Sequence, residues 1–307
     1  MKDLMVAVAG LFGRRFTQRQ KNAFLRYMGN RAAELDCKAV VDGSGQGMGG
    51  GCRNLYLGNI KRASVILTAP YDTPSRLLWP GMGYYPADPA RNLMRESVAM
   101  ALNLTLAALL VGVYYLLVMR RLLPLGGFAP WWSMVGMLAV AVTAFKLIFG
   151  FANRRNYSRN SASIVTALEY QKQQGRDVAV ALLDRSCCGY EGYRQLAQYL
   201  GGMAQSKRVL MLDCVASGSE LHLHCSEMLA GCLAGLDSNV QVHPLETDRL
   251  KRTPIELFPK GVLITGGTLQ DGETLIHGTR CGRDSEINLE KMNRVLVVLG
   301  NLIKKLA

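Results

Sequence analysis

The sequence predicts an α/β fold with a mostly parallel sheet and helices on both faces, interrupted by a two-helix transmembrane hairpin. Two observations lead to this prediction. Short apolar segments rich in β-branched residues alternate with segments of helical periodicity, a pattern typical of parallel sheets between two layers of helices. Within this pattern, residues 98–152 contain two long apolar segments, and no aspartate or glutamate occurs between Glu96 and Glu169.

The elements before the apolar segments are predicted from their periodicity. Residues 16–35 have apolar side chains at helical spacing, which indicates an amphipathic helix. Strands are expected at Lys38–Val41, Asn54–Leu57 and Ser64–Ala69, and the last is a β-branched run typical of a buried strand. The motif Gly45-x-Gly-x-x-Gly50 matches a dinucleotide fingerprint only formally, because a strand and not a helix follows it. We interpret it as a hairpin loop.

The alternation resumes after the apolar segments. We expect helices at Ser161–Gln174 and Tyr190–Met203, and strands at Val178–Leu183, Arg208–Leu212, Glu220–His224 and Gly261–Thr265. A final helix over Leu289–Leu306 follows Asn288, a favourable N-cap residue. Because one α/β pattern runs on both sides of the apolar segments, these segments are an insertion. Residues 1–97 and 153–307 therefore form the two parts of an α/β domain, and residues 98–152 form the hairpin.

The two apolar segments are each long enough to cross a membrane. Val98–Met119 holds no charged residue, and Trp131–Ala152 holds only Lys146. A helix needs about 20 apolar residues to cross a hydrocarbon layer of ~30 Å. A pair of buried core helices is the alternative, but neither segment has the polar stripe of a globular helix. Lys146 lies near the end of its segment, so we expect its ammonium group to extend to the interface.

The flanking charges predict the orientation of the hairpin. The arginines at its domain end outnumber those at its linker end by five to two: Arg91, Arg95, Arg154, Arg155 and Arg159 against Arg120 and Arg121. The positive-inside rule then places the α/β domain in the cytoplasm, on the inner side of the cell membrane. The eight cysteines show no disulfide spacing, which suits a reducing compartment.

The composition favours lipid over nucleic acid as a partner of the charged surface. The net charge is +13, but the basic residues are scattered and no motif of stacking aromatic residues accompanies them. Nucleic-acid binding is therefore not expected, and attraction to anionic lipid head groups is the simpler interpretation. The apolar run Met5–Phe12 lacks a small-residue cleavage site and is not interpreted as a signal peptide.

Five segments in a fixed order carry a family resemblance. They are the strand and turn 65–74 (VILTAPYDTP), the helix start 160–169 (NSASIVTALE), the strand 178–184 with the turn 189–192 (GYEG), the strand 209–213 (VLMLD), and strand 261–264 with His277 and the last helix. This order resembles the di-zinc exopeptidase family, which includes bacterial aminopeptidases and glutamate carboxypeptidase-like enzymes.

The resemblance implies a particular site. In that family two zinc ions share a bridging Asp; one ion also binds a first His and a later Asp, and the other binds the second residue of a Glu-Glu pair and a last His. The first Glu of the pair is the general base for the metal-bound water. Such chemistry requires oxygen and imidazole ligands with one open position, and a carboxylate within reach of the water.

Several of these positions carry other residue types in this chain. Carried over by the resemblance, Pro70 stands for the first His, Arg159 for the bridging Asp, and Cys187-Cys188 for the Glu-Glu pair, while Asp72, Asp213 and His277 are retained. A guanidinium at the bridging position would oppose a metal, because unit charges 4 Å apart interact by about 4 kcal/mol at a dielectric of 20, and a divalent ion doubles this. We therefore expect no catalytic residues and no bound metal at this remnant cleft.

Two alternatives concern the cysteines and histidines. Cys188, with Asp213 and His277, could form a remodelled single-metal site, and zinc is expected only in that case. Cys187 and Cys188 could also act as a nucleophile or redox pair, or simply fill the space left by the carboxylates. His222 and His224 point to one face of their strand, where we expect solvent-facing residues rather than metal ligands, and His243 is expected in a loop.

The leading hypothesis is a membrane-anchored, zinc-exopeptidase-like protein without metal-dependent peptidase activity, a pseudoenzyme that binds a peptide or a membrane-protein partner. One alternative is an active hydrolase with a single-metal or cysteine-based site. Another is a structural subunit of a membrane complex, in which intramembrane Lys146 would pair with an acidic residue of another chain.

Overall fold

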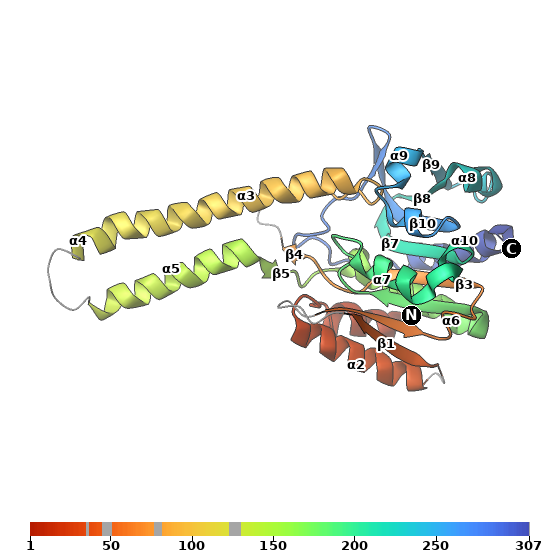
Figure 1. Ribbon diagram of the computed structural model, residues 1–307, viewed down its shortest axis with the longest axis horizontal. Coiled ribbons are helices and arrows are strands. Elements are labelled where there is room, and N and C mark those ends of the chain that lie inside the picture. The colour runs from red at the N-terminus through yellow and green to blue at the C-terminus, as the bar shows by residue number, and fades with distance from the viewer. Residues whose placement is uncertain (35–36, 45–50, 77–81, 123–129, 307) are drawn as a thin grey trace.

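The computed structural model describes residues 1–34, 37–44, 51–76, 82–122 and 130–306. It shows an α/β body from which a long helical hairpin projects (Figure 1). The predicted loop at residues 45–50 and most of the linker between the two apolar segments lie outside the described residues.

A mixed sheet forms the centre of the body. Its strand order is β1-β2-β6-β3-β7-β10-β8-β9, and β11 pairs with β10. The strands are β1 (Ala39–Ser44), β2 (Cys52–Leu57), β3 (Val65–Pro70), β6 (Val178–Leu183), β7 (Arg208–Gly218), β8 (Glu220–Ser226), β9 (Val240–Leu245), β10 (Gly261–Gln270) and β11 (Glu273–Leu275).

The central four strands, β6, β3, β7 and β10, are parallel. Every residue of β3 and β6 is buried, as expected for continuous apolar strands covered on both faces. The flanking pairs β1–β2, β2–β6 and β8–β10 are antiparallel, so the sheet is mixed rather than mostly parallel. Alternation in the sequence predicts the parallel centre but does not specify the direction of the edge strands.

Helices cover both faces of the sheet. One face packs against α1 (Lys2–Met5), η1 (Val6–Leu11), α2 (Gln18–Glu34), α6 (Ala162–Gln174), α8 (Glu227–Leu233) and α10 (Leu289–Leu306). The other packs against α7 (Glu191–Leu200), η6 (Gly201–Gln205), α9 (Thr247–Leu250) and η7 (Pro254–Leu257). The two layers confirm the predicted α/β architecture.

The hairpin consists of two long helices. The first runs through α3 (Pro89–Tyr114), η2 (Tyr115–Met119) and α4 (Arg120–Leu122), and the second is α5 (Trp131–Phe149). Both are long and apolar enough to cross a membrane, and only 6% and 17% of their most apolar windows are buried. They are therefore not the core helices considered as the alternative interpretation.

Specific contacts fix the start and the packing of the hairpin. The carboxylate of Asp88 caps α3 by accepting a hydrogen bond from the Arg91 backbone N–H at 3.0 Å, and Pro89 occupies the first turn, where no N–H is needed. Small residues, Ala107 and Ala144, lie buried between the two helices. At the root of the hairpin, β4 (Ser75–Arg76) pairs with β5 (Phe151–Ala152) (Figure 1).

Sequence periodicity missed the short elements. The N-terminal apolar run forms α1 and η1, which pack on the sheet. His243 lies in β9, paired with His224 of β8, so its expected loop position is wrong. Pro244 suggested a loop, but in an edge strand the absence of its N–H is tolerated.

Candidate functional site

Several of the sequence-predicted site residues, together with Asp184, lie at or near the carboxyl ends of the central parallel strands. Pro70 ends β3, Asp184 follows β6, and Asp213 lies in β7. Neighbouring parallel strands end at one edge of the sheet, where α/β folds place their ligand sites. The loop after β6 and the kink at residues 157–161 complete this edge.

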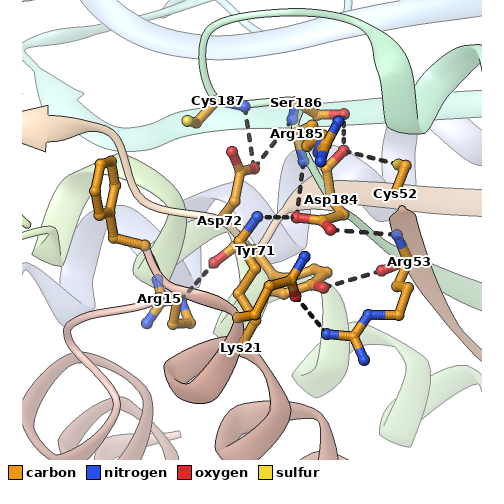
Figure 2. Close-up of polar contacts among 12 residues, drawn as sticks. Arg15, Lys21, Cys52, Arg53, Tyr71, Asp72, Asp184, Arg185, Ser186 and Cys187 are labelled. Atoms are coloured by element: carbon orange, nitrogen blue, oxygen red, sulfur yellow. Dashed lines mark hydrogen bonds and ion pairs between the residues drawn. The ribbon is translucent and has the colours of Figure 1, made fainter. Parts of the chain in front are cut away.

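Asp72 organises the loop that carries the cysteine pair. Its Oδ1 accepts hydrogen bonds from the backbone N–H groups of Ser186 at 3.0 Å and Cys187 at 3.1 Å (Figure 2). The side-chain amide of Asn160 donates to the Asp72 carbonyl. Burial raises the pKa of Asp72, although the ammonium group of Lys21 and the hydrogen bonds from the loop act against this shift. The retained carboxylate thus positions a loop.

Arg159 lies in a sharp kink before α6. Arg159 has extended backbone angles, and Asn160 has φ 67° and ψ −50°, close to the rare γ-turn conformation with positive φ. The carboxylate of Asp284 accepts from the backbone N–H groups of Ser158 at 2.7 Å and Arg159 at 3.1 Å. Burial raises the pKa of Asp284 to about 6. The kink turns the Arg159 side chain into the body.

The guanidinium group of Arg159 is buried in the remnant cleft. Its side chain is only 1% exposed, and its Cζ lies 3.9 Å from the centre of the Tyr84 ring. It donates to the Cys187 carbonyl and, at 3.3 Å, to Thr279 Oγ1. Burial alone lowers its pKa, but the Tyr84 hydroxyl, nearby thiols and Asp213 outweigh burial and hold the pKa well above the ordinary value. The site therefore contains a permanent positive charge.

Tyr84 connects this cation to Asp213. Its hydroxyl donates to Asp213 Oδ2 at 2.7 Å, while the Cys214 thiol contacts Asp213 Oδ1 at 3.2 Å. The backbone of Tyr84 forms an isolated bridge with Ile276. Sequence reasoning missed Tyr84, Thr279 and Asp284, because no motif marks a residue that approaches the site from a loop.

The two adjacent cysteines have different environments. Their Sγ atoms are 3.7 Å apart, with Cys187 buried and Cys188 exposed. The hydrogen bond between the thiols and burial raise the pKa of Cys187 well above its ordinary value. The same hydrogen bond, with the positive charges of Arg159 and Arg280, lowers the pKa of Cys188. We therefore expect Cys188 to be the more reactive thiol.

His277 does not join this group. Its side chain is exposed, although the preceding Ile276 bridges Tyr84. Thr279 and Arg280 from the same loop reach the site instead: Thr279 contacts Arg159, and Arg280 forms a 2.6 Å ion pair with Glu96 of α3. The structure thus connects Asp72, Arg159, the cysteine pair and Asp213, either by direct contact or through one intervening residue. His277 remains at the surface.

The zinc ions implied by the resemblance do not fit these residues. Within the described ranges, no three His, Cys, Asp or Glu side chains come together as a metal-binding group, so Cys188, Asp213 and His277 do not form one. The cavity beside Arg159 measures about 20 Å³, roughly the space that one water molecule needs. A divalent ion 4 Å from the guanidinium would be opposed by about 8 kcal/mol at a dielectric of 20.

Next to this cleft, Asp184 belongs to a structural network that ties α2 to the sheet (Figure 2). Lys21 and Asp184 form a buried ion pair of 2.5 Å. Asp184 also accepts from the backbone N–H groups of Arg185 at 2.9 Å and Arg53 at 3.2 Å. These contacts join α2, β2 and the loop after β6 at one carboxylate.

Three histidines form a histidine cluster in β8 and β9, at the end of the sheet that β9 forms. They are His222, His224 and His243. His222 Nδ1 lies 3.0 Å from His243 Nε2, and the rings of His224 and His243 stack with centroids 5.1 Å apart. His222 and His224 share a face as predicted, but both are buried, so their expected solvent exposure is wrong. Burial lowers the pKa of all three, that of His224 to about 3.

Comparisons with known proteins identify the fold. No protein-family profile matches the sequence, and no curated protein matches it. Among solved structures, a Zn-dependent exopeptidase from Parabacteroides distasonis is similar over 98% of this chain and 95% of that chain (TM-score 0.52, 13% identity). A glutaminyl cyclase from Porphyromonas gingivalis is similar over 100% and 98% (0.56, 10%). The LapA aminopeptidase of Legionella pneumophila is similar over 100% and 70% (0.55, 9%).

At these identities the similarity establishes the fold alone. The chain has the fold of zinc-dependent exopeptidases, and glutaminyl cyclases have the same fold. The resemblance inferred from the five sequence segments is confirmed at this level.

Proposed function

We propose that this chain is a membrane-anchored protein of the zinc-exopeptidase fold that binds a partner and has no metal-dependent peptidase activity. The buried guanidinium of Arg159 is the observation that carries the proposal. It lies among the residues that the resemblance assigns to the metal site, in contact with the Cys187 carbonyl and the Tyr84 ring. The positively charged side chain of Arg159 therefore lies where the family's peptidase chemistry would require bound zinc ions.

The exposed apolar hairpin supports the membrane anchor. Leu104, Leu117 and Leu138 are more than half exposed, as are many other apolar side chains of α3 and α5, and such a surface is stable only when lipid or another protein covers it. We place the hairpin across the cell membrane with the α/β domain in the cytoplasm. The native Cys232, exposed on the domain, provides the test. An impermeant maleimide added to intact cells should label it only after permeabilisation, and labelling without permeabilisation would overturn the orientation.

The partner is proposed to be a membrane protein rather than a peptide in the cleft. Tyr84 and Arg159 line a cavity that has room for about one water molecule. The root of the hairpin is also tied to this region. Arg95 donates to the Gly83 carbonyl at 3.2 Å, and Arg280 pairs with Glu96. A partner that binds the hairpin would therefore act on a segment that is in contact with the site.

Peptide hydrolysis and co-purification test the proposal together. The full-length protein in detergent should hydrolyse no aminoacyl or N-terminal glutaminyl peptide above background, with or without added zinc. It should retain a stoichiometric membrane protein on purification from its native membrane. Hydrolysis that a chelator abolishes would overturn the proposal.

A structural subunit is the related alternative that Lys146 favours. This lysine is exposed on α5, and a charge within a bilayer generally pairs with another group. Loss of a co-purifying protein in Lys146→Leu, together with an unchanged thermal midpoint of the variant, would favour a subunit that docks through this residue.

A cysteine-based hydrolase is the second candidate, and the exposed Cys188 with its lowered pKa favours it. Hydrolysis that persists in chelator and disappears in Cys188→Ala but not in Cys232→Ala would support this candidate instead.

A further inference from the structure

A cavity at the root of the hairpin lies outside the remnant cleft. It measures about 480 Å³ and is lined by residues 10–14, which end η1 and begin the following turn, by Gln20 and Ala23 of α2, and by Arg154, which follows β5. Two arginines, Arg14 and Arg154, face this one cavity. Both are exposed, and within the described part of the chain no hydrogen bond or ion pair engages either guanidinium.

Glycine at position 13 lets the two arginine-bearing segments come together. A Cβ at Gly13 would lie 2.4 Å from the Ala9 carbonyl oxygen and 2.7 Å from the Arg154 carbonyl oxygen, which no other residue could tolerate. The side chain of Asn156 donates to the Gly13 carbonyl at 3.0 Å and fixes the contact. The contacts of Gly13 with Arg154 and Asn156 thus hold the two arginine-bearing segments together, although these segments are distant in the sequence.

The length of α5 places this cavity at the level of lipid head groups. The helix has 19 residues, which span about 28 Å at 1.5 Å per residue, close to the ~30 Å of the hydrocarbon layer. Gly150, which caps α5, then lies at the boundary of the hydrocarbon, and Arg154 follows it within the head-group layer. Leu11, on the rim of the cavity, is 78% exposed, an unfavourable position in water and a favourable one beside acyl chains.

We propose that the cavity between Arg14 and Arg154 binds the phosphate head group of an anionic phospholipid, with Leu11 against its acyl chains. Two guanidinium groups provide the planar donors that suit a phosphate. Gln20 adds a side-chain amide to the lining. The side-chain carbonyl oxygen of Gln20 already accepts hydrogen bonds from the backbone N–H groups of Phe16 and Thr17, each at 3.1 Å. The NH₂ group is the remaining polar group of this side chain.

The lipid, rather than free phosphate, is the expected source of the anion. Free phosphate would use the arginines but would gain nothing from Leu11 or from the bilayer. The inference rests on the membrane anchor proposed above, but it is tested in detergent, where lipid retention does not depend on the orientation of the hairpin. A confirmed hairpin without selective lipid retention would refute this inference alone.

Native mass spectrometry of the full-length protein tests the inference. The protein in detergent is mixed with equal amounts of phosphatidylglycerol and phosphatidylcholine, and the bound lipid is counted. We expect retention of one phosphatidylglycerol in preference to phosphatidylcholine. The double variant R14Q/R154Q should weaken this binding by about 25-fold, since one basic residue near an anionic surface is worth about 5-fold, or ~1 kcal/mol.

The control variant R62Q/R176Q removes the same charge from two exposed arginines. Arg62 precedes β3 and Arg176 precedes β6, so both lie near the amino ends of these parallel strands. The control variant should bind phosphatidylglycerol as the wild type does. Equal loss in both double variants, equal retention of the two lipids, or displacement of phosphatidylglycerol by millimolar inorganic phosphate would each overturn the inference. If R14Q/R154Q does not fold, Leu11→Asp provides a second variant, which should weaken lipid binding without removing a positive charge.

Discussion

Replacement of Arg159 by methionine tests how the remnant site is stabilised. Methionine retains much of the side-chain length but removes the charge above the Tyr84 ring and the donors to the Cys187 carbonyl and Thr279. A desolvated cation–π contact is worth about 2 kcal/mol, and a hydrogen bond to a charged group about 1.5–3 kcal/mol. Part of this is recovered by burial of the methionine, so we expect a loss of about 3–5 kcal/mol.

Thermal unfolding of the full-length protein in detergent measures this loss. In a domain of this size, 1 kcal/mol corresponds to roughly 2–4 °C, so the midpoint of Arg159→Met should fall by about 6–20 °C. Arg62→Met, at an exposed position, is the control and should change stability by less than about 0.5 kcal/mol. An unchanged or raised midpoint in Arg159→Met would refute the argument that the guanidinium is a structural cation.

Three further predictions concern other groups. Cys188 should react with iodoacetamide faster than the exposed Cys232, because the hydrogen bond with Cys187 and the neighbouring arginines lower the pKa of Cys188; equal rates would contradict this. The histidine cluster should make the fold sensitive to acid. Its folded-state pKa values are lowered, so the unfolded chain binds more protons below pH 6.5 and stability falls from there towards about pH 3, the pKa of His224. Replacing all three histidines by glutamine should flatten this dependence relative to the wild type. Finally, Lys21→Met should destabilise the fold by about 3–5 kcal/mol by leaving Asp184 buried without its partner, whereas loss of less than 1 kcal/mol would show that the remaining hydrogen bonds suffice.

The sequence predicts those parts of the fold in which one physical signal dominates. Val178–Leu183 is uniformly apolar and forms β6 over the predicted residues, and Leu289–Leu306 has strong helical periodicity and forms α10 as predicted. The hairpin helices follow from length and apolar composition. By contrast, β9 is half exposed and interrupted by Pro244, so neither periodicity nor propensity marks it as a strand.

The site was predictable only where chain order determines position. Asp72, Arg159, Cys187 and Asp213 lie near the ends of strands or at the start of a helix, so an ordered set of motifs brings them to one edge of the sheet. Tyr84 comes from a loop, and its place between Arg159 and Asp213 depends on a bridge to Ile276. The exposure of His277 likewise depends on loop geometry, which residue type does not determine.

The zinc content of the purified protein tests the central claim most directly. Full-length protein would be dialysed against micromolar zinc, freed of unbound metal, and analysed for metal per chain, with Arg159→Asp measured beside the wild type. A buried guanidinium lies in the site, and within the described residues no three potential ligand side chains come together. We therefore expect well below one zinc ion per chain in both proteins. Two tightly held zinc ions per wild-type chain would contradict the account.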